Sequence, residues 1–125
     1  MKNFPLTTAE EKLAEIIWDK APLMSPELVL LAGHVMDWKK STTYTILKKL
    51  CDKGVFKNEN ANITVLLSRE ELAAQQSRRY IEDAFGGSLP RFIASFFCGE
   101  KLSREQAAEL KQLIESHEEG EENGK

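Results

Sequence analysis

Apolar residues recur every three or four positions in three segments of the first half of the chain. This spacing places apolar side chains on one face of a helix. The first helix is expected to begin at Thr7 or Thr8, because each is followed three residues later by a glutamate in a capping-box pattern. The second begins at Ser25, and the third begins near Ser41 and ends at Gly54. The predicted inward faces are Ala9, Leu13, Ile16 and Ile17, then Leu28, Leu31, Ala32 and Val35, then Ile46, Leu47 and Leu50.

The pattern changes after the third helix. Val55-Phe56-Lys57 and Ile63-Thr64-Val65-Leu66-Leu67 are rich in apolar and β-branched residues, and they flank an asparagine-rich stretch over 58–62. Such a sequence predicts a β-hairpin with a turn at the asparagines. Three helices followed by a hairpin is the order of a winged helix-turn-helix, in which the hairpin is the wing.

The second half of the chain is predicted to be helical. Ser68 and Glu71 form a second capping-box pattern, Pro90 lies in the first turn of a shorter helix, and Ser103 with Gln106 opens the last one. The predicted fold class is therefore mainly α with a small β-hairpin. Its parts are an N-terminal winged-helix domain over 1–68, a helical region over 69–117, and a disordered, acidic tail over 118–125.

The helical region has only about fifty residues, too few to bury a good core by itself. Its apolar stripe can be covered by folding back on the winged helix or by pairing with a second copy. The clean separation after the wing favours pairing, and a two-fold homodimer is the commonest result. The predicted dimerisation residues are Leu89, Phe92, Ile93, Phe96, Phe97, Leu110, Leu113 and Ile114.

Charge is unevenly distributed along the chain. The net charge is −3, yet six lysines and a single acid, Asp52, lie between Lys39 and Lys57. A local basic patch in an acidic protein indicates a surface that meets phosphates. Lysines are assigned to the DNA backbone, and short hydroxyl side chains to bases or phosphates. The candidate DNA-binding residues are Lys39, Lys40, Ser41, Thr42, Tyr44, Thr45, Lys48, Lys49 and Lys57.

Several of these residues have a second interpretation. The hydroxyls of Ser41, Thr42 and Thr45 also suit a helix cap and a solvated face. Tyr44 either touches a sugar or thymine methyl group, or packs at the edge of the core. Trp18 and Trp38, near helix ends, are assigned to the core.

Other classes of protein fit the sequence poorly. No apolar run approaches the roughly 20 residues of a membrane span, and residues 1–30 lack a signal-peptide pattern. The cysteines, Cys51 and Cys98, and the histidines, His34 and His117, show no metal-binding spacing. A glycine-rich phosphate loop, a nucleophile elbow and a paired-histidine motif are also missing. We therefore expect a cytoplasmic protein that is not an enzyme, inserts in no membrane, and needs neither metal nor cofactor.

Over residues 6–116 the chain resembles the BlaI/MecI family of penicillinase-type repressors. The resemblance implies that the helix at 41–53 reads the major groove, that the wing lies along the backbone, and that the helices after Ser68 form the dimer. In the best-known members a membrane sensor-protease system triggers cleavage at a bond that corresponds to Ser95-Phe96. The motifs that carry the resemblance are Leu6-Thr7-Thr8-Ala9-Glu10, Trp18, Trp38, Ser41-Thr42, Leu47, Leu50, Lys53-Gly54, Gly86-Gly87-Ser88-Leu89, Phe96, Leu102-Ser103 and Glu109-Leu110.

The chain departs from the family's usual pattern at several points, which include Lys39-Lys40 before the third helix and Tyr44 within it. Ser95 stands where the family usually has asparagine, and the second wing strand is Val65-Leu66-Leu67 in place of a tyrosine-rich segment. The paired cysteines of copper-responsive relatives are missing, which argues against copper sensing.

The sequence thus predicts a homodimeric, sequence-specific DNA-binding repressor. Its operator would be a pseudo-palindrome with half-sites separated by about one DNA turn or a multiple of it. A protein-interaction module built on a winged helix is the alternative, because a fold does not dictate a function. A regulator with a ligand pocket under the aromatic residues of 89–97 is a third reading.

Overall fold

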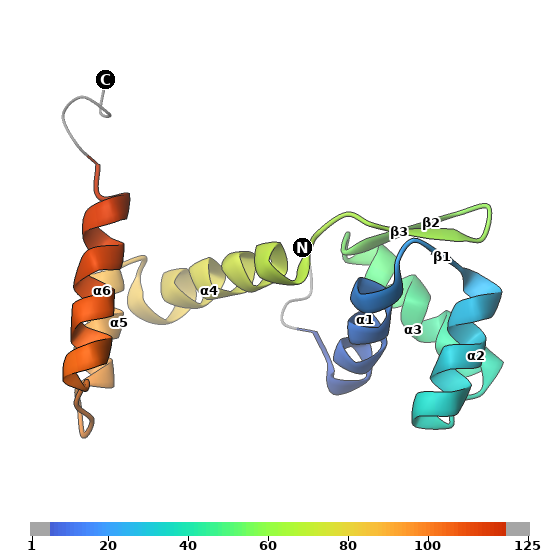
Figure 1. Cartoon of the computed structure of the whole chain (residues 1–125), viewed down its shortest axis with the longest axis horizontal. Coiled ribbons are helices and arrows are strands. Elements are labelled where there is room, and N and C mark those ends of the chain that lie inside the picture. Colours follow the sequence, from blue (N-terminus) through green and yellow to red (C-terminus); the bar gives the residue numbers. More distant parts are fainter. Residues whose placement is uncertain (1–5, 120–125) are drawn as a thin grey trace.

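The computed structural model describes residues 6–119 of the 125-residue chain. Within this range three helices and a small sheet form a winged helix, and three further helices follow it (Figure 1). The predicted mainly α fold with a wing is therefore confirmed. The elements are α1 (Thr8–Lys20), β1 (Leu23–Met24), α2 (Ser25–Met36), α3 (Lys40–Asp52), β2 (Phe56–Glu59), β3 (Asn62–Val65), α4 (Arg69–Phe85), α5 (Leu89–Phe96) and α6 (Arg104–His117).

The helix ends follow local sequence signals. Thr7 caps α1: its Oγ1 accepts a hydrogen bond from the Glu10 amide at 3.1 Å, and the Glu10 carboxylate accepts one from the Thr7 amide at 2.9 Å. Ser68 and Glu71 make the same reciprocal pair at the start of α4. Gly54, just after α3, has φ +82°, the left-handed conformation that glycine adopts without a steric penalty. These three predictions are confirmed.

The wing is tighter than predicted. Asn60 and Ala61 have φ 54° and 65°, so a two-residue turn with both φ values positive joins β2 to β3. The predicted five-residue turn over 58–62 is therefore wrong. Asn58 and Asn62 belong to the strands, where Asn58 pairs with Ile63 and Asn62 pairs with Glu59. The sheet also has a third strand, β1, on the other edge of β3. Only two residues long, β1 carries no sequence signal and forms because β3 offers it a partner.

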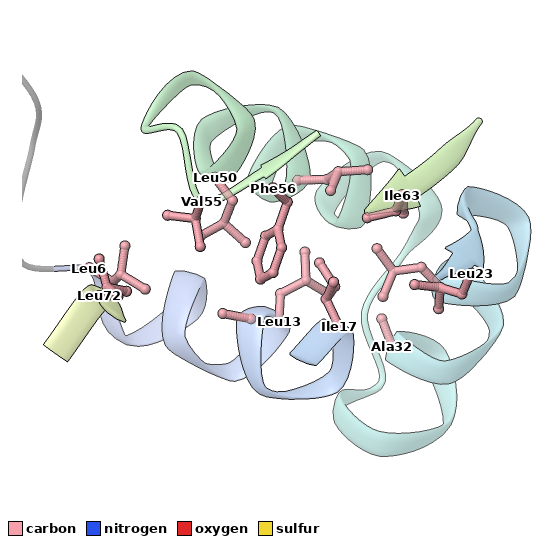
Figure 2. Close-up of a cluster of buried hydrophobic side chains, with 13 residues drawn as sticks. Leu6, Leu13, Ile17, Leu23, Ala32, Leu50, Val55, Phe56, Ile63 and Leu72 are labelled. Carbon is pink, nitrogen blue, oxygen red and sulfur yellow. The ribbon is translucent and has the colours of Figure 1, made fainter. Parts of the chain in front are cut away.

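The core lies between the three N-terminal helices and the sheet (Figure 2). Figure 2 shows Phe56 of the wing reaching toward Leu13 of α1, and both side chains are at most 1% exposed. Trp18 and Trp38 are partly buried against this core, as predicted. Val35 was expected on the inner face of α2, but it is 66% exposed, so that prediction is wrong.

The C-terminal helices are much less covered than the winged helix. α4 leads away from it, and α5 follows at its far end (Figure 1). Tyr80 and Phe85 of α4 pack edge-to-face on Phe92 of α5, with ring centroids 6.3 and 5.5 Å from that of Phe92. Beyond Leu72, no residue of the described part of α4, α5 or α6 is fully buried.

Two remaining predictions concern the chain end and the membrane. The acidic tail predicted over 118–125 lies outside the described residues from position 120 onward. Among the helices of residues 6–119, none combines the length and the apolar character needed to cross a bilayer.

Candidate nucleic-acid interface

The two faces of α3 differ sharply in chemistry. Thr43, Leu47 and Leu50 recur at helical spacing and are buried against the core. Even the hydroxyl of Thr43 is used internally, because its Oγ1 donates a hydrogen bond to the Lys39 carbonyl at 3.1 Å. The outer face of the first three turns carries hydroxyls and lysines, and the exposed carboxylate of Asp52 lies at the end of the helix. Its exposed residues, with the two lysines at the start of the helix, are Lys39, Lys40, Ser41, Thr42, Thr45, Lys48 and Lys49.

One lysine of the basic segment does not belong to this face. The ammonium of Lys53, with a side chain 9% exposed, forms an ion pair with the carboxylate of Glu10, which is 2% exposed. Burial alone would raise the pKa of Glu10, but hydrogen bonds from Lys53 and the Thr7 amide lower it below its ordinary value. Lys53 therefore neutralises a buried carboxylate and ties the start of α1 to the end of α3.

Two other lysines make exposed ion pairs. Lys48 Nζ lies 3.5 Å from Asp52 Oδ2 on the same helix, and Lys57 Nζ lies 3.2 Å from Glu59 Oε1 on the wing. Pairs this exposed are weak, since water screens both charges. A phosphate that approaches this surface can therefore replace either carboxylate at little cost.

Tyr44 is half-buried where α3 meets α2. Its hydroxyl donates a hydrogen bond to Oγ of Ser25, at 3.2 Å, and Ser25 is buried at the start of α2. The ring also borders a shallow depression between α3 and β2, which Cys51 and Asn58 help to line. Of the two roles open to Tyr44, packing at the core edge has direct contacts to support it.

The wing places one basic side chain and an apolar surface beside α3. Lys57 is exposed on β2, whereas Val65 and Leu66, at the end of β3 and just beyond it, are 39% and 53% exposed. Apolar side chains on the second wing strand lack donors for phosphate oxygens. Any phosphate contact from the wing therefore falls to Lys57 and to the polar turn.

The junction after the wing contains a residue that no sequence pattern marks as important. Arg69, the first residue of α4, binds Glu15 of α1 through two nitrogens, and its guanidinium carbon lies 5.2 Å from the centre of the Trp18 ring. Glu15 is 54 residues away along the chain. A pair of residues so far apart in the chain leaves no local sequence pattern from which it could be predicted.

Within residues 6–119, no three histidine, cysteine or carboxylate side chains gather closely enough to hold a metal ion. Cys51 is half-buried, and burial followed by the nearby Asp52 charge raises the pKa of its thiol. Cys98 is exposed at the end of α5.

Comparison with known proteins extends these observations to the whole chain. The family model described as penicillinase repressor matches residues 6–116. A penicillinase repressor of Bacillus licheniformis is 23% identical over 122 residues, which cover 94% of this chain and 95% of that protein. The methicillin resistance regulatory protein MecI of Staphylococcus aureus strain N315 is 21% identical over 117 residues, or 90% of this chain and 95% of MecI. An uncharacterized 16.5 kDa protein of Latilactobacillus sakei is 26% identical over 113 residues, or 87% and 77% of the two chains.

Proposed function

Because this chain belongs to the penicillinase repressor family, we propose that it represses transcription by binding a pseudo-palindromic DNA operator as a homodimer. The observation that carries the proposal is the outer face of α3, where every exposed residue from Lys39 to Lys49 is a lysine or a hydroxyl. In a helix-turn-helix the second helix of the motif enters the major groove. Here that helix is α3, which directly follows α2.

The exposed residues divide into two roles. Ser41, Thr42 and Thr45 lie in the first two turns of α3, from which side chains of a recognition helix contact base edges. Lysine is a flexible point charge that suits phosphates, which position a protein on DNA without specifying sequence. Lysines at 39, 40, 48 and 49 are assigned to the backbone beside the groove, and Lys57 to the backbone under the wing. Tyr44 would act from the edge of this surface while its hydroxyl stays on Ser25.

Dimerisation would use the C-terminal helices. Phe96 and Phe97 are 44% and 45% exposed, and Leu113 and Ile114 are 58% and 55% exposed. A monomer would leave this apolar surface in water, at a cost of about 25 cal/mol for each Å². The same surface on a second chain covers it symmetrically. The proposed contacts are Leu89, Phe92, Ile93, Phe96, Phe97, Leu110, Leu113 and Ile114, among which Phe92 already packs partly on α4.

The dimer proposal is tested by Phe96→Asp. A carboxylate in an apolar interface would have to be desolvated without a partner, so the variant should sediment as a monomer and bind the operator weakly. Glu109→Asp, on an exposed position of α6, is the matched control and should stay dimeric. A Phe96→Asp protein that sediments as a dimer would contradict the proposed interface.

The DNA proposal is tested by neutralising Lys48 and Lys49 together. Each phosphate contact contributes about 0.9 to the slope of log affinity against log salt concentration, so losing four contacts in a dimer should lower the slope by up to about 3.6. The measurement is fluorescence anisotropy with DNA from upstream of the protein's own gene. Lys101→Ala with Lys111→Ala removes the same charge from the C-terminal region and should leave the slope unchanged. Equal slopes for the two double variants would refute the proposed role of α3.

Inactivation by proteolysis is a linked proposal, based on the same family. Ser95 and Phe96 are exposed in the last turn of α5, and Ser95 Oγ donates a hydrogen bond to the Phe92 carbonyl at 2.7 Å. Cleavage between them would separate α6 from the rest of the chain and remove half of the dimer surface. A chain ending at Ser95 should therefore sediment as a monomer. If it remains a dimer with full operator affinity, cleavage at this bond is not the inactivating event.

One observation favours the alternative of a protein-interaction module. Val65 and Leu66 expose an apolar edge on the wing, where a DNA-binding wing would gain from polar side chains. The two readings differ in the salt titration. Affinity for DNA that falls steeply with salt supports the repressor, whereas no affinity at low salt would favour the interaction module.

A further inference from the structure

The direction in which α4 leaves the winged helix is set by a small number of contacts. Leu72 is the last fully buried residue of α4 in the described chain. Beyond this first turn, a groove of about 530 Å³ separates α4 from α1, with Ala73 and Gln76 on one side and Glu11 and Lys12 on the other. α4 is therefore attached to the winged helix at its base and leads away from it farther along (Figure 1).

Arg69 supplies the polar part of that attachment. Its Nε and Nη2 donate hydrogen bonds to the two carboxylate oxygens of Glu15, at 3.2 and 2.5 Å. The same guanidinium stacks over Trp18, whose indole nitrogen donates a hydrogen bond to the Leu67 carbonyl at 2.9 Å. The hydrogen bond from Arg69 lowers the pKa of the Glu15 carboxyl, so the ion pair persists into more acidic solution than it otherwise would.

This arrangement constrains orientation more than it stabilises the fold. Arg69 and Glu15 are 48% and 58% exposed, and an ion pair so open to water contributes little to folding. A planar guanidinium held by two parallel hydrogen bonds and one aromatic face nevertheless has a defined direction. Together with Leu72, which is buried in the core one turn later, this contact holds the first turn of α4 against the winged helix.

The length of α4 amplifies any change at its base. Seventeen residues at 1.5 Å each give a helix of about 25 Å. A tilt of about 8° at Arg69 therefore moves the far end by roughly 3.4 Å, which is the rise of one DNA base pair. In a dimer joined at the far ends, the same tilt in both subunits would change the separation of the two α3 helices by an amount of this order.

We propose that Arg69, held by Glu15 and Trp18, is a positioning residue that sets the separation of the two recognition helices and hence the half-site spacing the dimer accepts. The inference rests on the proposed function, because it requires a dimer that binds two half-sites. It assigns a role in DNA selection to a residue outside the proposed DNA-binding surface of α3 and the wing. Without the contacts of Arg69 to Glu15 and Trp18, α4 would sample several directions and the dimer would tolerate several half-site spacings.

The first test compares operators in which one base pair is added or removed between the half-sites. The wild-type protein should lose roughly tenfold in affinity with either change, since each base pair also rotates one half-site by about 35°. Arg69→Ala should bind the best operator more weakly than the wild-type protein does. Its affinity for the altered operators should be almost equal to its affinity for the best one. Arg78→Ala removes an exposed arginine from the same helix and should keep the wild-type profile. Affinity for an isolated half-site should be the same in all three proteins.

The second test needs no DNA. Nitroxide labels are placed at Cys98 and at Lys20→Cys in a Cys51→Ala background, and labelled protein is diluted with unlabelled protein so that only distances within one chain are measured. Electron spin resonance should give a narrow distance distribution for wild-type and Arg78→Ala proteins, and a distribution about twice as broad for Arg69→Ala. A melting temperature close to wild type would show that orientation, not folding, has changed.

The outcomes separate this inference from the proposed function. Equal spacing profiles and equal distance distributions for Arg69→Ala and wild type would overturn the inference and leave the repressor intact. If wild-type protein binds no specific DNA, the proposed function fails, and an unchanged distance distribution would then refute the role of Arg69 independently.

Discussion

The buried pair of Glu10 and Lys53 leads to a prediction with a defined magnitude and pH dependence. Replacing Lys53 by methionine keeps most of the side-chain volume but removes the ammonium that faces Glu10. Leaving a buried charge without its partner costs about 3–5 kcal/mol. The side chains are only 9% and 2% exposed, so solvent screening reduces this cost little.

Protonation of Glu10 limits this loss of stability. For a carboxyl with an ordinary pKa of 4.5, taking up a proton costs about 3.4 kcal/mol at pH 7 but only about 0.7 kcal/mol at pH 5, at about 1.36 kcal/mol per pH unit. Lys53→Met should therefore destabilise the protein by about 3 kcal/mol at pH 7 and by about 1 kcal/mol at pH 5.

The direction of this pH dependence follows from the pKa of Glu10 in the wild-type protein and in the variant. In the wild-type protein the pKa of Glu10 is lowered, so its contribution to stability is present above pH 4.5 and is lost only as the pH falls further. In the variant the contributions of Lys53 are lost and the effect of burial stays, so the pKa of Glu10 is higher than in the wild-type protein and less stability is gained as the pH rises. The difference between the two proteins must shrink as the medium becomes more acidic.

The assay is urea unfolding followed by tryptophan fluorescence at pH 7 and pH 5. Lys49→Met is the matched control, because Lys49 is exposed on the same helix, and it should change the free energy of unfolding by less than about 0.5 kcal/mol at either pH. In the DNA titration the opposite is expected: Lys49→Met should lower the salt slope by about 0.9 per lost contact, and Lys53→Met should leave the slope unchanged. A cost of less than about 1 kcal/mol at pH 7, or an equal cost at both pH values, would contradict the proposed role of the buried ion pair.

Two further predictions concern stability and use the same unfolding assay. Ala61 has φ 65°, a conformation that costs an L-residue about 1 kcal/mol, so Ala61→Gly should stabilise the protein by about 0.5–1 kcal/mol. Asn60→Gly should stabilise it less, because asparagine tolerates this conformation. A loss of stability in Ala61→Gly would contradict the turn geometry. Trp18→Phe removes the hydrogen bond to the Leu67 carbonyl and should cost about 1–2 kcal/mol, and an unchanged free energy of unfolding would show that this bond is not formed in solution.

Much of the fold follows from interactions between residues close in sequence. Capping at Thr7 and Ser68 and the left-handed glycine after α3 involve groups within a few residues of each other, so their patterns are visible in the chain. The outward orientation of Ser41, Thr42 and Thr45 was predictable for the same reason, because helical periodicity relates each position to its buried neighbours.

The remaining features depend on contacts between distant residues. Lys53 was not among the five lysines assigned to DNA, but its partner was not predictable, because Glu10 lies 43 residues earlier and is brought to it by the packing of α1 on α3. Tyr44 meets Ser25 only once α2 and α3 have crossed. β1 exists because β3 presents an open edge, and Val35 is exposed although Leu28, two turns earlier on the same face of α2, is buried.

By itself, then, the sequence determined which segments are helices, where they begin and end, and which side of α3 is polar, because those properties arise from hydrogen bonds and periodicity within a few turns. Only the tertiary structure decided which charges remain available and in which direction α4 leaves the winged helix. Both depend on side chains such as Arg69 and Glu15, which are 54 residues apart and are brought together by packing of the core.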